Sequence, residues 1–247
     1  MPAEEATVSD DHVVVAEFAD LFRAAGPPDR LLDALPGVLA ALDVRGTVVD
    51  LGAGTGHGVL ALAEAFPDSA VVAVERSAAM RTVLTSRLAY RPDLRGRVTV
   101  LRGDVFDVEQ PGPWGAALAI HLVCQLDHDH RRRLWRLLAD HLTDDAVAVL
   151  DRHYGVDRPR TVPLRLSATV RLGDCEYQRW YASDVAGPDR MRWHNVYRVL
   201  RGGVVLAEHD VHGQVWAADE PTILAETADA GLRHEFRDDF VLLRRAG

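Results

Sequence analysis

The chain has 247 residues, of which 48% are hydrophobic, so it is long enough for one α/β domain with an added substructure. Its formal net charge of -9 argues against nucleic acid and anionic membranes as partners. The two cysteines, Cys124 and Cys175, lie far apart and form no CxxC motif, which predicts two buried thiols in a cytoplasmic protein. No apolar run reaches ~18 residues, and the acidic first residues lack an apolar core, so we expect neither a membrane span nor a signal peptide.

Two helices are predicted at the start of the chain. Apolar residues recur at helical spacing within residues 13–25 and again within residues 29–42. Gly26-Pro27-Pro28 separates the two segments, because glycine followed by proline ends a helix. The pattern predicts that both helices cover one face of a sheet.

A glycine-rich turn follows the first predicted strand, residues 48–51. Three glycines alternate with other residues in this turn: Gly52, Gly54 and Gly56. Glycine is needed where the backbone turns sharply and leaves room for a ligand, and the first βα turn of a doubly wound sheet is such a place. A dinucleotide-binding loop requires G-x-G-x-x-G. The third glycine of that motif would fall on His57 or Val59, so we expect no NAD-type cofactor.

An acidic residue ends the second predicted strand, residues 71–74. Glu75 lies nineteen residues after Gly56, and an acid about 20 residues beyond the glycine loop can accept hydrogen bonds from both hydroxyls of a ribose. Ser77 is a suitable N-cap for the next helix. Met80, near the start of that helix, is placed either to pack on an adenine ring or to join the core.

Polar side chains also follow the third, fourth and fifth predicted strands, which are residues 98–101, 116–120 and 146–150. The residues after these strands are Asp104 and Val105, then His121, then Asp151, His153 and Tyr154. Because the carboxyl ends of parallel strands meet at one edge of a sheet, we expect these residues to lie near the glycine turn. Histidine suits proton transfer near neutral pH, so His121 and His153 are candidate bases. The alternative is that His121 only holds loop backbone.

The run Asp127-His128-Asp129-His130 alternates carboxylates with imidazoles, as zinc sites often do. It directly precedes a predicted helix at residues 131–142, and acidic residues before a helix are ordinary caps. We therefore predict no metal site here.

A long stretch after the fifth strand alternates in the manner of strands. Its four predicted strands are residues 164–172, 175–182, 190–200 and 204–215. They form an antiparallel sheet, followed by a helix at residues 219–230 and a hairpin at residues 234–243. Along the second strand, Tyr177 and Tyr181 share one face and Trp180 lies on the other. The pattern does not choose which face meets the core.

Residues 50–56, Asp-Leu-Gly-x-Gly-x-Gly, closely resemble the first motif of class I S-adenosylmethionine-dependent methyltransferases, and residues 46–154 match that family strand by strand. The resemblance implies an α/β fold, namely a doubly wound, seven-stranded Rossmann-like sheet with an inserted antiparallel β-sheet. It also implies S-adenosyl-L-methionine as the cofactor and S-adenosyl-L-homocysteine as the product. One departure is Gly115, which stands just before the fourth strand where many relatives have an aspartate.

The same resemblance implies cofactor-binding roles. The three glycines would pass under the methionine part of the cofactor, with Asp50 acting on its ammonium and Glu75 on the ribose hydroxyls. Met80 would pack on the adenine ring. Asp104 would accept a hydrogen bond from the adenine amino group, and the backbone of Val105 would face the ring.

The inserted segment resembles that of methyltransferases that dimethylate amino sugars or methylate amines of natural products, including peptide-derived ones. This resemblance implies that the insert builds the acceptor pocket. The chain then divides into helices over the cofactor site (1–42), a cofactor-binding core (43–154), the inserted sheet (155–218) and a completing helix and hairpin (219–247). Candidate acceptor-binding residues are aromatic: Tyr154, Tyr177, Trp180, Tyr181 and Trp193. Acids of the insert would attract a protonated amine: Glu176, Asp184, Glu208 and Asp210.

We therefore predict a bacterial, cytoplasmic enzyme of natural product biosynthesis that methylates an amine of a small molecule or short peptide. A metal-dependent enzyme would need a carboxylate set after strands four and five, and Asp151 is the only good member of such a set, so we predict metal-independent transfer. One alternative is an O-methyltransferase acting on a hydroxylated metabolite. A second is a non-catalytic protein that binds S-adenosylmethionine. A homodimer is a possible assembly.

Overall fold

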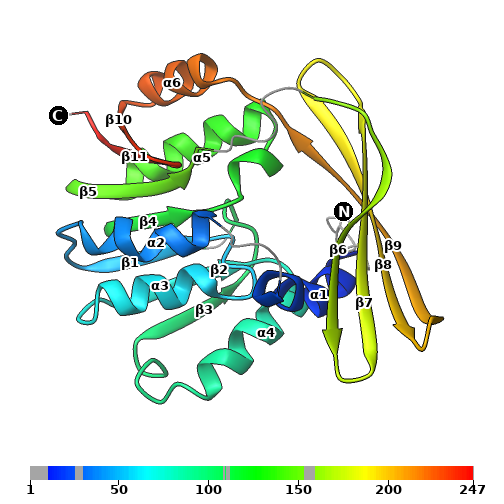
Figure 1. Ribbon diagram of the computed structural model, residues 1–247. Coiled ribbons are helices and arrows are strands. Elements are labelled where there is room, and N and C mark those ends of the chain that lie inside the picture. Colours follow the sequence, from blue (N-terminus) through cyan, green and yellow to red (C-terminus); the bar gives the residue numbers. More distant parts are fainter. Residues whose placement is uncertain (1–10, 26–29, 108, 110–111, 153–158, 247) are drawn as a thin grey trace, which may run out of the picture.

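The computed structural model describes residues 11–25, 30–107, 109, 112–152 and 159–246. Its centre is a seven-stranded sheet in the order β10-β11-β5-β4-β1-β2-β3 (Figure 1). The strands are β1 (Thr47–Leu51), β2 (Val71–Glu75), β3 (Val98–Arg102), β4 (Trp114–Ala119), β5 (Leu142–Asp151), β10 (Leu232–Arg237) and β11 (Phe240–Arg245). The first five are parallel, and β11 lies antiparallel to both β5 and β10.

Both faces of this sheet are apolar, and successive strand residues pack against different helices. On one face Val48 belongs to the same core cluster as residues of three helices: α2 (Arg30–Ala40), α3 (His57–Ala65) and α4 (Ala78–Ala89). On the other face Val49 shares a cluster with α5 (His128–His141) and α6 (Glu220–Asp229). A short 3-10 helix, η1 (Val123–Gln125), follows β4. The central sheet is therefore buried between two helical layers.

A second sheet follows β5 and stands beside the helical layers (Figure 1). Its antiparallel strands are β6 (Val162–Leu172), β7 (Cys175–Val185), β8 (Arg190–Arg201) and β9 (Val204–Trp216), which pair in chain order. Glycines with positive φ at 173, 202 and 203 make two of the three connecting turns tight. The predicted fold class, a seven-stranded α/β sheet with an added antiparallel sheet, is confirmed.

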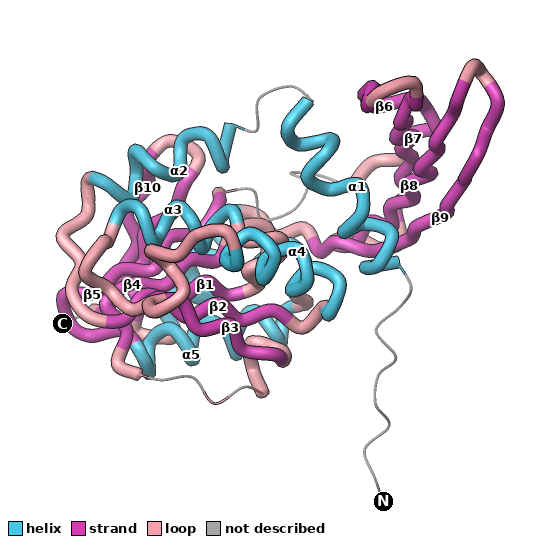
Figure 2. Tube along the Cα trace, turned by 90° about the horizontal axis from the view of Figure 1, so that it is seen from below, coloured by secondary structure: helices cyan, strands magenta, loops and turns pink. Residues whose placement is uncertain are grey.

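Helix α1 (Asp11–Ala25) lies between the two sheets, as both views show (Figures 1 and 2). Phe18 is fully buried there and stacks on Tyr197 of β8, with ring centroids 4.8 Å apart and ring planes 6° apart. Phe18 also meets Tyr177 of β7 edge-on. The face of the second sheet that carries Tyr177 is thus its inner face. Trp180, one residue out of phase, lies on the outer face.

Gly115 departs from the pattern of its relatives for a steric reason. A Cβ atom built at this position would lie 1.8 Å from the carbonyl oxygen of Arg45. The chain entering β1 passes so close to β4 that no side chain fits, so an aspartate is excluded here.

The two thiols differ from their prediction. Cys124 and Cys175 are both free, but both are half-buried and not buried. Within the described residues, no helix is long and apolar enough to cross a bilayer.

Candidate functional site

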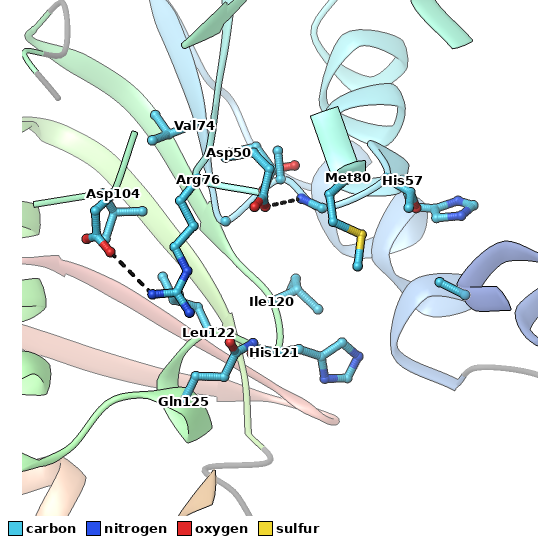
Figure 3. A pocket seen from close by; sticks show the side chains of 18 of the residues that line it. Asp50, His57, Val74, Arg76, Met80, Asp104, Ile120, His121, Leu122 and Gln125 are labelled. Carbon is cyan, nitrogen blue, oxygen red and sulfur yellow. Dashed lines mark hydrogen bonds and ion pairs between the residues drawn. The ribbon is translucent and has the colours of Figure 1, made fainter. Parts of the chain in front are cut away.

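A cavity of about 330 Å³ opens at the carboxyl ends of the parallel strands. It lies where the sheet order reverses, since β1 has β2 on one side and β4 on the other, and ligands of open α/β sheets bind at such points. All predicted cofactor-binding residues except Gly56 line it, and so does His121 (Figure 3). Ala19 of α1 and Leu32 of α2 complete the wall, so both leading helices border the cavity.

The glycine loop is held by Glu75, the acid that ends β2. The three predicted loop glycines all have positive φ, and Gly56 (φ 95°) sits at the start of α3. The Gly54 amide donates to Glu75 Oε2 (2.8 Å), and the Ser77 amide donates to Glu75 Oε1 (2.7 Å). Each carboxylate oxygen can accept a further hydrogen bond. Glu75 therefore organises the loop and still has capacity for a ligand hydroxyl.

Asp50 is the most unusual ionisable group of the cavity. It is buried, and its Oδ2 has no hydrogen-bond partner within the described part of the chain. Burial, and then the charge of Glu75, raise the pKa of Asp50 to about 7, although a hydrogen bond from the Val59 backbone opposes the shift. A buried carboxylate oxygen without a partner is costly, so a cation bound in this cavity would be stabilised by Asp50.

Gly58, which the sequence analysis did not select, makes room for that carboxylate. An alanine Cβ there would lie 2.5 Å from Asp50 Oδ2 and 2.7 Å from Leu118 Cδ2.

We expect Gly58→Ala to destabilise the fold by about 1–3 kcal/mol through overpacking, measured by urea unfolding. The matched control is Gly37→Ala in α2, where nothing lies within 4 Å of the new methyl group. It should stabilise by up to about 1 kcal/mol, because alanine favours helix. Equal effects of the two variants would contradict this reasoning.

Asp104 lies at the cavity wall after β3, as predicted, but it has a partner that the sequence analysis did not identify. Its Oδ1 accepts a hydrogen bond from the Phe106 amide (3.1 Å), and its Oδ2 lies 3.7 Å from Arg76 Nη1. Figure 3 shows the Arg76 side chain reaching toward Asp104. An adenine amino group bound here would share this carboxylate with Arg76. Met80 and Val105 line the same cavity.

His121 follows β4 in a backbone conformation that few residues adopt. Its φ is 57°, in the left-handed region. The buried carboxylate of Asp151, at the end of β5, fixes it by accepting from the His121 amide (2.7 Å). The Gln125 side chain donates to the His121 carbonyl (2.7 Å). The backbone is therefore anchored on both sides while the imidazole stays exposed at the cavity.

Helix α1 is bound to the glycine loop by a network that the sequence analysis did not predict. Asp20 accepts hydrogen bonds from Thr55 Oγ1 (2.9 Å), and it also pairs with His57 Nε2 (2.9 Å) and with Arg87 of α4. Burial would raise the pKa of Asp20, but the hydrogen bonds from His57, Arg87 and Thr55 outweigh it and lower the pKa to about 2. Asp20 is therefore ionised at neutral pH, and its hydrogen bonds hold α1 against the glycine loop.

Residues 127–130 form the N-terminal cap and first turn of helix α5. Asp127 is its N-cap and accepts from the His130 amide (2.9 Å), and His130 Nδ1 lies 2.7 Å from the same oxygen. His128 Nδ1 instead lies 2.8 Å from Glu226 Oε1. The two imidazoles thus contact different carboxylates.

The aromatic residues predicted to bind the acceptor lie in different environments. Tyr177 and Trp193 pack into the cluster around Phe18 of α1. Trp180 lies on the outer face, where its Nε1 donates to Gln178 Oε1 (3.0 Å), so it does not face the cavity. Tyr181 shares the inner face but does not line the cavity. His153 and Tyr154 lie outside the described residues.

The acids expected near the entrance are on the outer face of the second sheet. Glu208 pairs there with Arg198, and Asp210 with His194. Glu176 lies 3.4 Å from Arg171. The strand register turns Glu176, Glu208 and Asp210 away from the cavity, so these three acids do not lie near its entrance as expected.

Comparison with known proteins adds to this geometry. Residues 48–145 match the family model described as a methyltransferase domain. The sugar N-methyltransferase KedS8 from Streptoalloteichus sp. shares 21% identity with this chain, with a TM-score of 0.71 and 93% of each chain covered. The glycopeptide N-methyltransferase MtfA, solved with S-adenosylmethionine, shares 18%, with a TM-score of 0.55, 94% of this chain and 95% of that one covered. The O-methyltransferase sol2 of Alternaria solani is 32% identical over 100 residues, which are 40% of this chain and 23% of sol2.

Residues 48–145 therefore match a methyltransferase domain, and the overall fold is that of solved methyltransferases such as KedS8 and MtfA. The resemblance inferred from the glycine loop is confirmed. The predicted cofactor agrees with MtfA, whose structures include complexes with S-adenosylmethionine and S-adenosylhomocysteine. The match to sol2 spans about a quarter of that protein, so it carries no statement about the activity of the whole chain.

Proposed function

We propose that the protein transfers the methyl group of S-adenosylmethionine to an amine of a small natural product or modified peptide. The observation that carries the proposal is one cavity that combines the buried Asp50, the loop-holding Glu75 and an exposed, anchored His121. The similar proteins include both N-methyltransferases and O-methyltransferases. Methylation of a hydroxyl therefore stays as the second candidate.

The residues of the cavity fit this cofactor by their chemistry. The buried carboxylate of Asp50, with one oxygen that has no hydrogen-bond partner among the described residues, suits the cofactor's ammonium, and the spare acceptor capacity of Glu75 suits its ribose hydroxyls. Asp104, with Arg76 beside it, is the acceptor for the adenine amino group. When bound, S-adenosylmethionine supplies an electrophilic methyl group on a positively charged sulfur.

The protein's own part in the transfer is positioning and proton removal. An amine must be unprotonated to attack, and His121 is the exposed base at this cavity. Its anchored backbone fixes where the imidazole stands, and aligned reactants can remove several kcal/mol of the barrier. We place this activity in the bacterial cytoplasm, without nucleic acid or membrane as partner.

An unbiased acceptor screen tests the proposal. Purified protein is incubated with methyl-labelled S-adenosylmethionine and a panel that pairs amines, including amino sugars and short peptides, with hydroxylated analogues. Label should appear on nitrogen. Label on oxygen alone would establish the O-methyltransferase alternative, and cofactor binding without any transfer would establish a non-catalytic protein.

Cofactor binding should release protons and strengthen as the pH rises from about 6 to about 7.5. The raised pKa of Asp50 means that the empty cavity holds a proton on this carboxyl below about pH 7, and a bound ammonium favours the ionised form. Calorimetry in buffers of different ionisation enthalpy measures the release. Asp50→Asn should abolish it, and a binding heat that is independent of buffer in the wild type would refute the assignment.

Turnover should continue unchanged after exhaustive chelation. Asp151, at the end of β5, is engaged with the His121 amide, and the cavity offers no set of carboxylates for a metal among its described residues beyond the cofactor-facing acids. Product formation is measured before and after chelation. Activity that is lost and then restored by magnesium or zinc would overturn the metal-independent mechanism.

A further inference from the structure

Three metal-ligating side chains meet on the outer face of the second sheet. His194 of β8 pairs in register with His212 of β9, and Asp210 lies two residues before His212 on the same strand. One ligand atom from each of the three residues lies within 4.8 Å of the others. The imidazoles are stacked, with centroids 4.2 Å apart and planes 10° apart, and His194 Nε2 lies 2.6 Å from Asp210 Oδ1.

This cluster is separate from the cavity under α1. Trp193 packs into the inner cluster around Phe18, and neighbouring strand residues point to opposite faces, so His194 points outward. Asp210 and His212 are exposed and His194 is half-buried. An ion can therefore reach the cluster from solvent without disturbing α1 or the glycine loop.

The donor set selects a class of ion. Two imidazole nitrogens and one carboxylate oxygen suit zinc and its neighbours in the first transition row, whereas magnesium and calcium prefer oxygen alone. Zinc binds such atoms at about 2.0–2.2 Å, so the three atoms must approach one another by small rotations of exposed side chains. The paired strands already hold the three backbones in place, which lowers the entropy that binding would cost.

We propose that His194, Asp210 and His212 bind one divalent first-row transition-metal ion, of the zinc class, with water completing its coordination. The ion replaces the hydrogen bond between His194 and Asp210 as the contact between the two side chains. This site is independent of methyl transfer, so removing its ion leaves turnover unchanged.

The site is tested by isothermal titration calorimetry, in which zinc is added to untagged protein. Cobalt, whose complexes absorb visible light, is titrated separately as a spectroscopic substitute for zinc. We expect saturable binding of one equivalent and a visible cobalt spectrum. Loss of even a supporting residue costs about 10–100-fold in metal affinity, so His212→Ala and Asp210→Asn should each weaken binding at least about 10-fold. Magnesium should not compete.

The matched control is His234→Ala, which removes an exposed histidine of β10 far from the cluster in sequence and in a different sheet. It should bind zinc as the wild type does. Thermal unfolding checks that each variant is folded, and His194→Ala provides a second ligand variant. Absence of saturable binding by the wild type, or equal zinc affinity in the wild type and in folded ligand variants, would overturn the proposal.

Discussion

Replacing His121 with alanine should lower kcat by roughly 100-fold or more, the usual contribution of a positioned general base. The imidazole is exposed at the cavity, while its backbone is held by Asp151 and Gln125. The dissociation constant for S-adenosylmethionine should stay nearly unchanged, because the cofactor-facing groups Asp50 and Glu75 are left intact. Steady-state kinetics on the acceptor found in the screen, with calorimetry of cofactor binding, measure both quantities.

A second substitution separates the loss of the base from the strain of the left-handed backbone. Asparagine tolerates positive φ better than most residues but cannot act as the base. The kcat of His121→Asn should therefore fall as far as that of His121→Ala. Its thermal unfolding temperature should be at least as high as that of His121→Ala. Amine turnover by either variant at the wild-type rate would exclude the proposed role of His121.

Glu75→Ala should weaken binding of S-adenosylmethionine by about 1.5–3 kcal/mol, the scale of lost hydrogen bonds to a charged group. This corresponds to about a 10- to 150-fold rise in the dissociation constant. The variant loses the acceptor for the ribose hydroxyls and also releases the amides of Gly54 and Ser77, which hold the loop. Calorimetry with S-adenosylmethionine and S-adenosylhomocysteine measures the change.

Two controls locate the effect. Glu75→Gln keeps one carbonyl acceptor, so it should lose less affinity than Glu75→Ala. Glu64→Ala removes an exposed acid of α3 that pairs with Arg91 at the surface, and it should bind the cofactor as the wild type does. Wild-type affinity in Glu75→Ala would contradict the ribose assignment. NAD should bind to none of these proteins.

The sequence predicted the core of the fold well because its signals are local. Short apolar strands, the glycine loop and the acid at position 75 each follow from residues close together in the chain, and the parallel topology then brings the strand ends together. The cavity residues Asp50, Glu75, Asp104 and His121 could therefore be named in advance.

Features that depend on register or on close approach could not be predicted in this way. The pairing of β8 with β9 decides that Asp210 faces outward beside His194. The passage of the chain near Arg45 decides that residue 115 must be glycine. Asp20 meets Thr55 only through the packing of α1. Alternation along one strand contains none of this information.

Helix α1 is the structural link through which an acceptor bound against the second sheet would be thermodynamically coupled to the cofactor cavity. One side of this helix contacts the second sheet through Phe18, and Asp20 of the same helix binds the glycine loop through Thr55 and His57. A ligand that tightens the contacts on either side lowers the cost of ordering the other. Linkage is reciprocal, so any factor by which the cofactor strengthens acceptor binding equals the factor by which the acceptor strengthens cofactor binding.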